Sequence, residues 1–322
     1  MTRTFDDKPA VFEQTPLLFS ITGPSGTGKT YSGLRVATGI QRVNGGDIYG
    51  IDTEARRMLQ YANDFKFRHI DFRAPFSPLD YLDAIEHCVA RGAKTIVIDS
   101  LSHAHEGVGG ILEWHEREMG GDFRKQMIAW AKPKAAHRKL IARVIQLGIS
   151  LVSCFRAKDK IKPVKGGEPI HLGWSIIGAP EWIFEQTAAC LLMPGACGVP
   201  TWSPVESGEK ACVKLPGQFR RVFGEPRQLD EEMGEAMAKW AAGGVARSPV
   251  DILLDAYATC DADAFPSVEE DRKKLWPSLK GNVTAQSRLK EASAAATQRL
   301  KEERDYLEAH GASEGELEKA AG

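Results

Sequence analysis

One eight-residue segment constrains this chain more than any other. An apolar run at residues 17–22 precedes it and an amphipathic stretch at residues 30–40 follows it; the segment is Gly23, Pro24, Ser25, Gly26, Thr27, Gly28, Lys29 and Thr30. Its spacing matches the P-loop pattern G-x-x-x-x-G-K-[ST], whose glycines let successive backbone N–H groups point at phosphate oxygens. Lys29 should then reach the β- and γ-phosphates, and the Thr30 hydroxyl should bind Mg²⁺. The segment predicts a site for ATP with Mg²⁺.

Short apolar runs alternate with helical patterns between residues 16 and 193. The expected strands are residues 17–22, 48–52, 67–72, 95–99, 149–155 and 187–193. Several are rich in Ile and Val and show little polar alternation, which is typical of strands buried on both faces of a parallel sheet. We therefore expect an α/β fold with a mostly parallel central sheet and helices on both of its faces.

The pattern changes after residue 193. Residues 210–215 and 219–223 are expected to form antiparallel strands, and residues 230–242 a helix. A linker containing Gly243, Gly244, Ser248 and Pro249 follows, and then a helical pattern with a long charged segment at residues 284–310. We expect an N-terminal extension at 1–15, a nucleotide-binding core at 16–244 and a small C-terminal helical appendage at 245–322.

Two acids at the ends of predicted strands complete the site. Asp99 ends the apolar run 95–99, and an acid there can hold the Mg²⁺ shell as a Walker-B aspartate does. Glu54 follows the strand 48–52 and would point from its tip toward the γ-phosphate, where an acid can orient the attacking water. A strand that ends in an acid is common in α/β proteins, but the P-loop upstream favours the metal role of Asp99. From its spacing alone, Glu54 could instead be a solvated loop acid. Lys29, Glu54 and Asp99 are the predicted catalytic residues.

The order of these motifs resembles the RecA-like ATPase core, and more narrowly the phage-encoded AAA/RecA-like proteins of the single-strand-annealing recombinase group. The likeness covers residues 17–242 and is carried by the segments 50–57, 75–78, 98–103 and 155–158. It implies that Glu54 is the catalytic glutamate and Asp99 the Walker-B aspartate. Arg156 stands where RecA has a glutamine that senses the γ-phosphate. An arginine there would either bind the nucleotide or belong to a DNA-binding loop.

Net charge is −1, so any surface that attracts nucleic acid must be local. Residues 124–165 supply one, with twelve Lys and Arg against the single acid Asp159. Residues 158–173 carry glycines and prolines without clean periodicity, which predicts a mobile loop at the C-terminal end of a strand, where RecA-like ATPases place their second DNA-binding loop. The candidate DNA-binding residues are Lys158, Lys160, Lys162 and Lys165.

The resemblance also implies partners: single-stranded DNA, and further copies of the chain with ATP held near the contacts between subunits. A neighbouring subunit would then bring a basic residue to the phosphates, and the candidates are Lys210, Lys214, Arg220 and Arg221. The function implied is an ATPase that promotes annealing or strand exchange. Alternatives are a nucleotide-gated switch that binds a protein, such as a single-strand-binding protein, through the helical tail, a DNA motor of the helicase type, and a small-molecule kinase. Glu54 and the lack of an arginine-rich lid argue against the kinase.

The first eight residues lack the apolar core of a signal peptide, and no run approaches the ~18 apolar residues of a membrane span. We expect a cytoplasmic location without a membrane partner, in a bacterial host cell if the chain is phage-encoded. The cysteines show no CxxC pair or regular spacing and are expected to be reduced core residues: Cys88, Cys154, Cys190, Cys197, Cys212 and Cys260.

Overall fold

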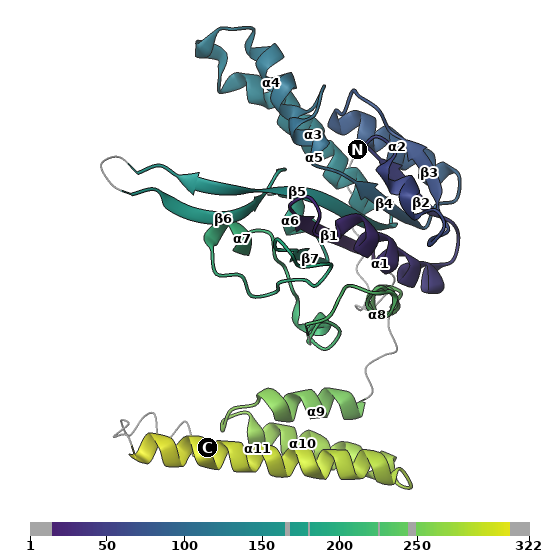
Figure 1. Ribbon diagram of the computed structural model, residues 1–322. Helices are drawn as coiled ribbons and strands as arrows, with labels where there is room; N and C mark the ends of the chain where they lie inside the picture. Colours follow the sequence, from purple (N-terminus) through teal and green to yellow (C-terminus); the bar gives the residue numbers. More distant parts are fainter. Residues whose placement is uncertain (1–14, 165–167, 180, 225, 244–248, 310–322) are drawn as a thin grey trace, which may run out of the picture. The chain divides into compact units, whose positions relative to one another are not determined.

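The computed structural model describes residues 15–164, 168–179, 181–224, 226–243 and 249–309. The chain divides into two compact units, Met1–Gly243 and Gly244–Gly322, which are drawn in Figure 1 and treated separately below. The predicted N-terminal extension, apart from Thr15, lies outside the described residues. Within them, no helix is both long enough and apolar enough to cross a membrane.

Seven strands of the described chain form one sheet in the first unit. They are β1 (Leu18–Gly23), β2 (Ile48–Asp52), β3 (Arg68–Asp71), β4 (Thr95–Asp99), β5 (Ser150–Lys162), β6 (Ile170–Ile176) and β7 (Ala188–Leu191). The order is β3-β2-β4-β5-β1-β7, and every pair along this path is parallel. Only β6 is antiparallel, to the outer half of β5. The carboxyl ends of the parallel strands therefore share one edge of the sheet.

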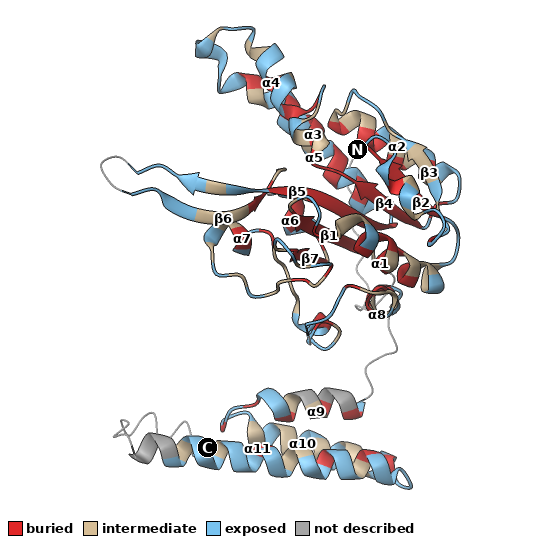
Figure 2. Ribbon diagram, in the orientation of Figure 1, coloured by how far each residue is buried: buried red, intermediate tan, exposed pale blue. Residues whose placement is uncertain are grey.

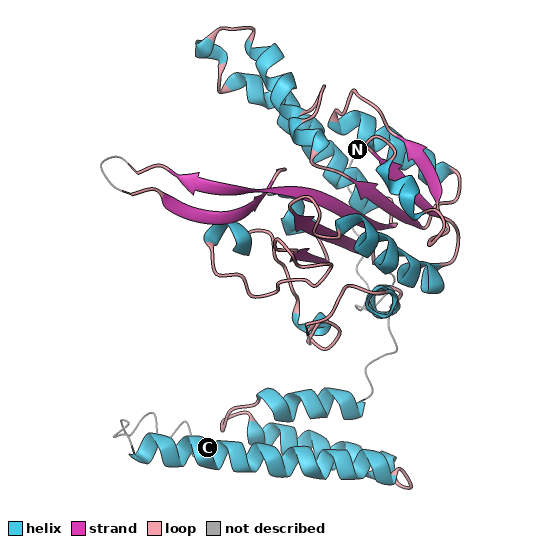
Figure 3. Ribbon diagram, viewed as in Figure 1, coloured by secondary structure: helices cyan, strands magenta, loops and turns pink. Residues whose placement is uncertain are grey.

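Helices and short 3₁₀ turns connect the strands (Figure 3). The helices of this unit are α1 (Lys29–Asn44), α2 (Pro78–Ala90), α3 (His103–Glu106), α4 (Ile111–Met119), α5 (Ala131–Gln146), α6 (Glu181–Glu185), α7 (Ser207–Lys210) and α8 (Glu231–Ala241). The 3₁₀ turns are η1 (Arg57–Tyr61), η2 (Phe123–Lys125), η3 (Ile128–Trp130) and η4 (Gly217–Phe219).

Each face of the sheet has its own hydrophobic core. Successive residues of a strand point to opposite faces, so Ile96 and Ile98 pack with Tyr81 of α2 and Leu140 of α5, whereas Val97 packs on the face covered by α1 and α8. Figure 2 shows these strands as the most deeply buried part of the unit. This double burial explains why the parallel strands could be predicted from continuous apolar runs.

Helices α1 and α8 approach one another at backbone distance. A Cβ placed on Gly39 of α1 would overlap the backbone of Glu231, and one placed on Gly234 of α8 would overlap the backbone of Val36. The glycines are therefore required by close approach rather than by helix propensity. Arg35 and Glu231 add an ion pair of 2.7 Å at the same crossing. The contact holds α1, which carries the end of the P-loop, against the rest of the unit.

Two sequence predictions are corrected by this unit. Residues 158–173 were predicted to be a mobile loop, but the described part of them forms a two-stranded ribbon in which β5 continues to Lys162 and pairs with β6. Residues 210–215 and 219–223 were predicted to be antiparallel strands. Instead, α7 ends at Lys210 and η4 ends at Phe219, and among the described residues the segment pairs with the sheet only through an isolated antiparallel bridge between Lys214 and Ala189.

The cysteine prediction needs a smaller correction. All six cysteines are free, but Cys197 is exposed, whereas the other five are buried as predicted.

The second unit is helical in its described residues. It comprises α9 (Pro249–Thr259), α10 (Phe265–Leu275), η5 (Trp276–Leu279) and α11 (Val283–Ala309). Its own core includes Leu253, Tyr257 and Leu289. A partly buried polar cluster adjoins that core, in which Glu269 accepts hydrogen bonds from the Tyr257 hydroxyl at 2.7 Å and from Arg272 Nη2 at 2.6 Å. These hydrogen bonds outweigh the effect of burial and lower the pKa of Glu269 to about 2.

Candidate nucleotide site

The P-loop connects β1 directly to α1, as the sequence predicts. Gly28 has a φ of 91°, a left-handed conformation that favours glycine. A Cβ on Gly23 would lie 2.7 Å from the carbonyl oxygen of Leu192 and 2.8 Å from the Thr27 hydroxyl, so the loop has no room for a larger residue there. Lys29 Nζ donates to the Pro24 carbonyl at 2.7 Å, which holds the ammonium group over the loop. Burial lowers the pKa of Lys29.

The strand register brings Asp99 to the beginning of α1. Asp99 is the last residue of β4, next to Asp52 of β2 and Cys154 of β5. The Thr30 hydroxyl donates a hydrogen bond to the Asp99 carboxylate. Burial raises the pKa of Asp99 to about 6, although the hydrogen bond from Thr30 and the charge of Lys29 act against that rise. The two predicted Mg²⁺ ligands are thus in direct contact.

Glu54 lies at the same edge of the sheet, paired with Arg156. Arg156 Nε donates to Glu54 Oε1 at 2.8 Å, and Arg156 Nη2 donates to Glu54 Oε2 at 2.7 Å. Arg57 Nη1 lies 3.8 Å from Glu54 Oε2 on the exposed side. Burial alone would raise the pKa of Glu54, but the hydrogen bonds and charge of Arg156 outweigh it and lower the pKa. Glu54 is therefore an ionised carboxylate with both oxygens engaged.

Sequence reasoning did not identify Asp52, which shapes the turn that carries Glu54. Its Oδ1 accepts the backbone N–H of Glu54 at 2.8 Å, and its Oδ2 accepts that of Met58 at 2.9 Å. Between these anchors, Ala55 and Arg56 have positive φ angles of 56° and 66°. An Asp that accepts the N–H two residues later makes an Asx-turn, so the sequence Asp52-Thr53-Glu54 carried a signal for this role.

Most of the predicted nucleotide-site residues line one cavity of about 590 Å³, whereas Gly23, Pro24 and Thr27 do not line it. Its lining includes Lys29, Thr30, Glu54, Asp99 and Arg156, together with four residues that the sequence did not single out: Arg57, Gln60, Tyr61 and Glu106. Pro24 lies beside it as the acceptor for Lys29, and Ser25, Gly26 and Gly28 line it. The structure thus brings together residues from the P-loop, α1, β4, β5 and the turn after β2.

The donors in this cavity are suited to ATP with Mg²⁺. A hydroxyl and a carboxylate in contact, Thr30 and Asp99, are the hard oxygen ligands that Mg²⁺ prefers, usually alongside phosphate oxygens and water. The glycine-rich turn is open at Gly26, where an added Cβ would meet no atom within 4 Å, and this leaves space for phosphate. Thr30 and Asp99 would hold the ion, and Lys29 and the loop amides would hold the phosphates.

The candidate DNA-binding lysines lie outside this cavity, on the ribbon of β5 and β6. Lys158 and Lys162 are exposed and Lys160 is half-buried, whereas Lys165 lies outside the described residues. The ribbon begins at Arg156. The carbonyl of Arg156 accepts the N–H of Ile177, which directly follows β6, at 2.8 Å. Ile177 itself lines the nucleotide cavity. Both strands of the ribbon are therefore anchored at the edge of the nucleotide site.

A family model for AAA domains matches residues 15–177, which include the P-loop, both acids and Arg156. The chain belongs to the AAA_24 family of AAA domains. No curated protein matches it. Among similar solved structures is a KaiC-like protein from the hyperthermophilic archaeon Pyrococcus horikoshii OT3, with 16% sequence identity and a TM-score of 0.26, covering 51% of this chain and 78% of that one. The predicted α/β fold with a mostly parallel sheet and C-terminal helices is confirmed. This AAA protein has a P-loop nucleotide site.

Proposed function

We propose that this AAA protein hydrolyses ATP with Mg²⁺ and that Glu54 orients the attacking water. The observation that carries the proposal is the convergence of Glu54 and Asp99, from separate strand ends, on the cavity that Lys29 and Thr30 line. Phosphoryl transfer is catalysed mainly by positioning and by stabilising charge, and these residues supply both. Mg²⁺, when bound, neutralises charge on the phosphates.

Arg156 could make the conformation of the site depend on whether a γ-phosphate is bound. Its guanidinium engages both oxygens of Glu54, and a bidentate arginine binds a phosphate equally well. We propose that Arg156 turns from Glu54 to the γ-phosphate of ATP, which frees the Glu54 carboxylate to accept a hydrogen from water. ADP lacks the γ-phosphate, so Arg156 would return to Glu54 after hydrolysis.

Two variants test this proposal. Glu54→Gln should bind ATP with nearly unchanged affinity but hydrolyse it at least about 100-fold more slowly, because a neutral amide is a poorer acceptor for the water. Arg156→Gln should slow turnover and also reduce the preference for ATP over ADP, measured as the ratio of their Kd values. Arg91→Gln removes an exposed guanidinium far from the carboxyl edge of the sheet and serves as the matched control. Unchanged turnover in Glu54→Gln would exclude Glu54 as the catalytic acid.

We further propose that the ATPase acts on single-stranded DNA through the ribbon, as its resemblance to the single-strand-annealing recombinase group implies. Lys158, Lys160 and Lys162 recur at every second residue of β5. Alternation along a strand puts Lys158 and Lys160 on the same side, and Lys162 follows after the shift in register between Lys160 and Ile161. Because the ribbon is anchored at Arg156, a movement of that residue toward ATP would be transmitted to the lysines. This coupling would be seen as a higher affinity for a single strand with a non-hydrolysable ATP analogue than with ADP.

Self-assembly is part of the same proposal. Phe123, Met127 and Ile128 are 79%, 83% and 73% exposed around η2 and η3. A contiguous patch of exposed apolar side chains is a feature of protein interaction sites. Sedimentation of the wild type and of a Phe123→Ser, Met127→Ser variant, with and without ATP, tests whether copies of the chain meet there. An unchanged sedimentation coefficient in the variant would exclude this surface.

A further inference from the structure

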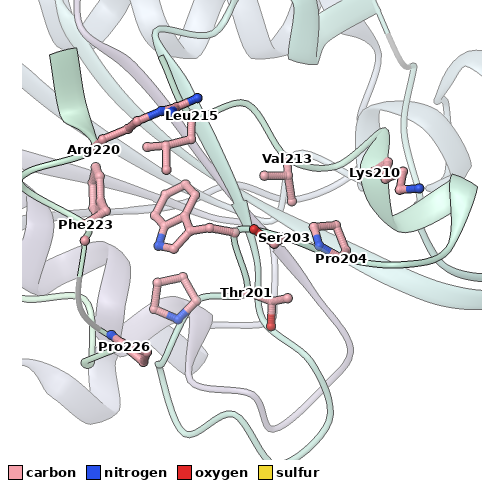
Figure 4. A pocket seen from close by; sticks show the side chains of 12 residues that line it. Thr201, Ser203, Pro204, Lys210, Val213, Leu215, Arg220, Phe223 and Pro226 are labelled. Carbon is pink, nitrogen blue, oxygen red and sulfur yellow. The ribbon is translucent and has the colours of Figure 1, made fainter. Parts of the chain in front are cut away.

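A second cavity, of about 890 Å³, lies outside the nucleotide site, and the two have no lining residue in common among the described residues. It is built against the edge strand β7. Thr201 N–H donates to the Leu191 carbonyl at 2.7 Å, and Lys214 and Ala189 exchange two hydrogen bonds of 2.9 Å. The two chain segments that form its walls are thus both fastened to the sheet. Figure 4 shows the side chains that line it.

One wall of the cavity is aromatic. The rings of Trp202 and Phe223 lie 4.5 Å apart with an angle of 46° between them. Phe223 is buried and stacks in turn on Phe19 of β1 at 6.2 Å, so the wall rests on the core. Val213 and Leu215 extend the apolar surface. A wall of this kind can stack against a planar ring.

The charged side chains among the described residues that line the cavity are positive. Lys210 and Arg220 line it, both are exposed, and neither has an ion pair within the described part of the chain. No Asp or Glu stands among the described residues of the lining. Figure 4 shows Arg220 beside Leu215 and Phe223 and shows Lys210 on the opposite side, beyond Val213. Two cations therefore stand on either side of an apolar floor.

From this arrangement we propose a second binding site that takes a nucleotide unit, with the base against Trp202 and a phosphate at each cation. Stacking of a base on an aromatic side chain is favourable and tolerates any base. A unit within a single strand carries a phosphate on both its 5′ and 3′ sides, which matches cations on opposite sides better than a monophosphate does. Lys210 and Arg220, expected from the sequence to reach across to another subunit's ATP, act here within their own chain.

Binding can be measured in the full chain with Lys29→Ala, which weakens the P-loop site. The probes are adenosine 5′-monophosphate, adenosine 3′,5′-bisphosphate and a ten-residue thymidine oligonucleotide. We expect the bisphosphate to bind at least about tenfold more tightly than the monophosphate, and a Lys210→Gln, Arg220→Gln pair to abolish that difference. Trp202→Leu should weaken the binding of all three probes about tenfold. Lys94→Gln removes an exposed lysine that directly precedes β4, away from the lining of this cavity; it is the matched control and should change nothing.

The outcomes separate the sources of the ligand and can overturn the proposal. If the affinities for the oligonucleotide and for the bisphosphate fall by the same factor in the paired variant, the site takes units of a single strand. If only the bisphosphate responds, the site takes free nucleotides. Failure of the bisphosphate to bind at millimolar concentration, or binding that the paired variant leaves unchanged, would overturn the proposal. Lys210 and Arg220 are both exposed, so the paired variant should fold, and a circular dichroism spectrum identical to that of the parent establishes this for each variant.

Discussion

Asp99 combines a stability cost with a functional role. Its carboxylate is 5% exposed, and burial raises its pKa from an ordinary 3.8 to about 6. Between these two values the folded protein binds more protons than the unfolded chain, so the free energy of unfolding falls as pH rises through this window. The loss is complete above pH 6 and amounts to about 3 kcal/mol at 1.36 kcal/mol per pKa unit.

Removing the charge of Asp99 should remove that cost. Asp99→Asn cannot ionise, so without nucleotide it should be more stable than the wild type above pH 6 by up to about 3 kcal/mol, with the gain shrinking toward zero near pH 4. Chemical unfolding at pH 4.5, 6 and 7.5 measures the difference. The same variant should lose Mg²⁺-dependent turnover. A variant that is less stable than the wild type at pH 7.5 would show that the buried carboxylate is stabilised by its surroundings.

At the scale of single elements, the ribbon of β5 and β6 makes the DNA proposal quantitative. Each lysine that neutralises a phosphate of a single strand contributes about 0.7 to the slope of log K against log salt concentration. Replacing Lys158, Lys160 and Lys162 together with Gln should therefore reduce the slope by about 2 and weaken binding most at low salt. Replacing them with Arg keeps the charge and should leave the slope unchanged. Fluorescence anisotropy of a labelled oligonucleotide between 50 and 300 mM salt measures both variants, and equal slopes for the Gln variant and the wild type would exclude the ribbon.

The ribbon also shows where sequence reasoning stops. Parallel strands such as β4 were predictable because burial on both faces leaves a continuous apolar run. The outer part of β5 has neither face buried, and Ile161 is 52% exposed, so no apolar alternation marked it as a strand. At residues 210–223 the opposite error arose. The apolar side chains there are buried by irregular chain that packs on the sheet, and Phe219 and Phe223 lie in the core without belonging to a strand.

The candidate site divides in the same way. Lys29, Thr30 and the P-loop glycines were predictable because their spacing alone defines the loop. The pairing of Glu54 with Arg156 was not, since the two residues are 102 positions apart and meet only through the register of the sheet. Asp52 shapes the turn after β2 by accepting the backbone N–H groups of Glu54 and Met58. Only the first of these hydrogen bonds, to the residue two positions later, follows a local sequence pattern.

For the whole molecule, the AAA family match ends at residue 177, before β7, α8 and the helical unit. The first unit nevertheless needs the residues beyond the match. β7 pairs with β1 beside the P-loop, the N–H of Gly198 donates to the Thr27 carbonyl at 2.9 Å, and the N–H of Thr15 donates to the carbonyl of Ala241 at 2.8 Å. These contacts place the end of the nucleotide-binding unit after α8. The helical unit that follows has a hydrophobic core of its own.

This division separates the recombination proposal from a nucleotide-gated switch. A chain ending at Gly243 keeps every contact described around the P-loop, so its Kd for ATP and its turnover should stay within about threefold of the full chain. If the ribbon binds DNA, the shortened chain should also keep ATP-dependent affinity for a single strand. If ATP instead gates a protein bound to the helical unit, full and shortened chains should both lack that affinity, and only the full chain should bind the protein. Loss of DNA binding together with unchanged turnover in the shortened chain would move the DNA contact from the ribbon to α9–α11, because the ATPase would then be intact and the ribbon insufficient.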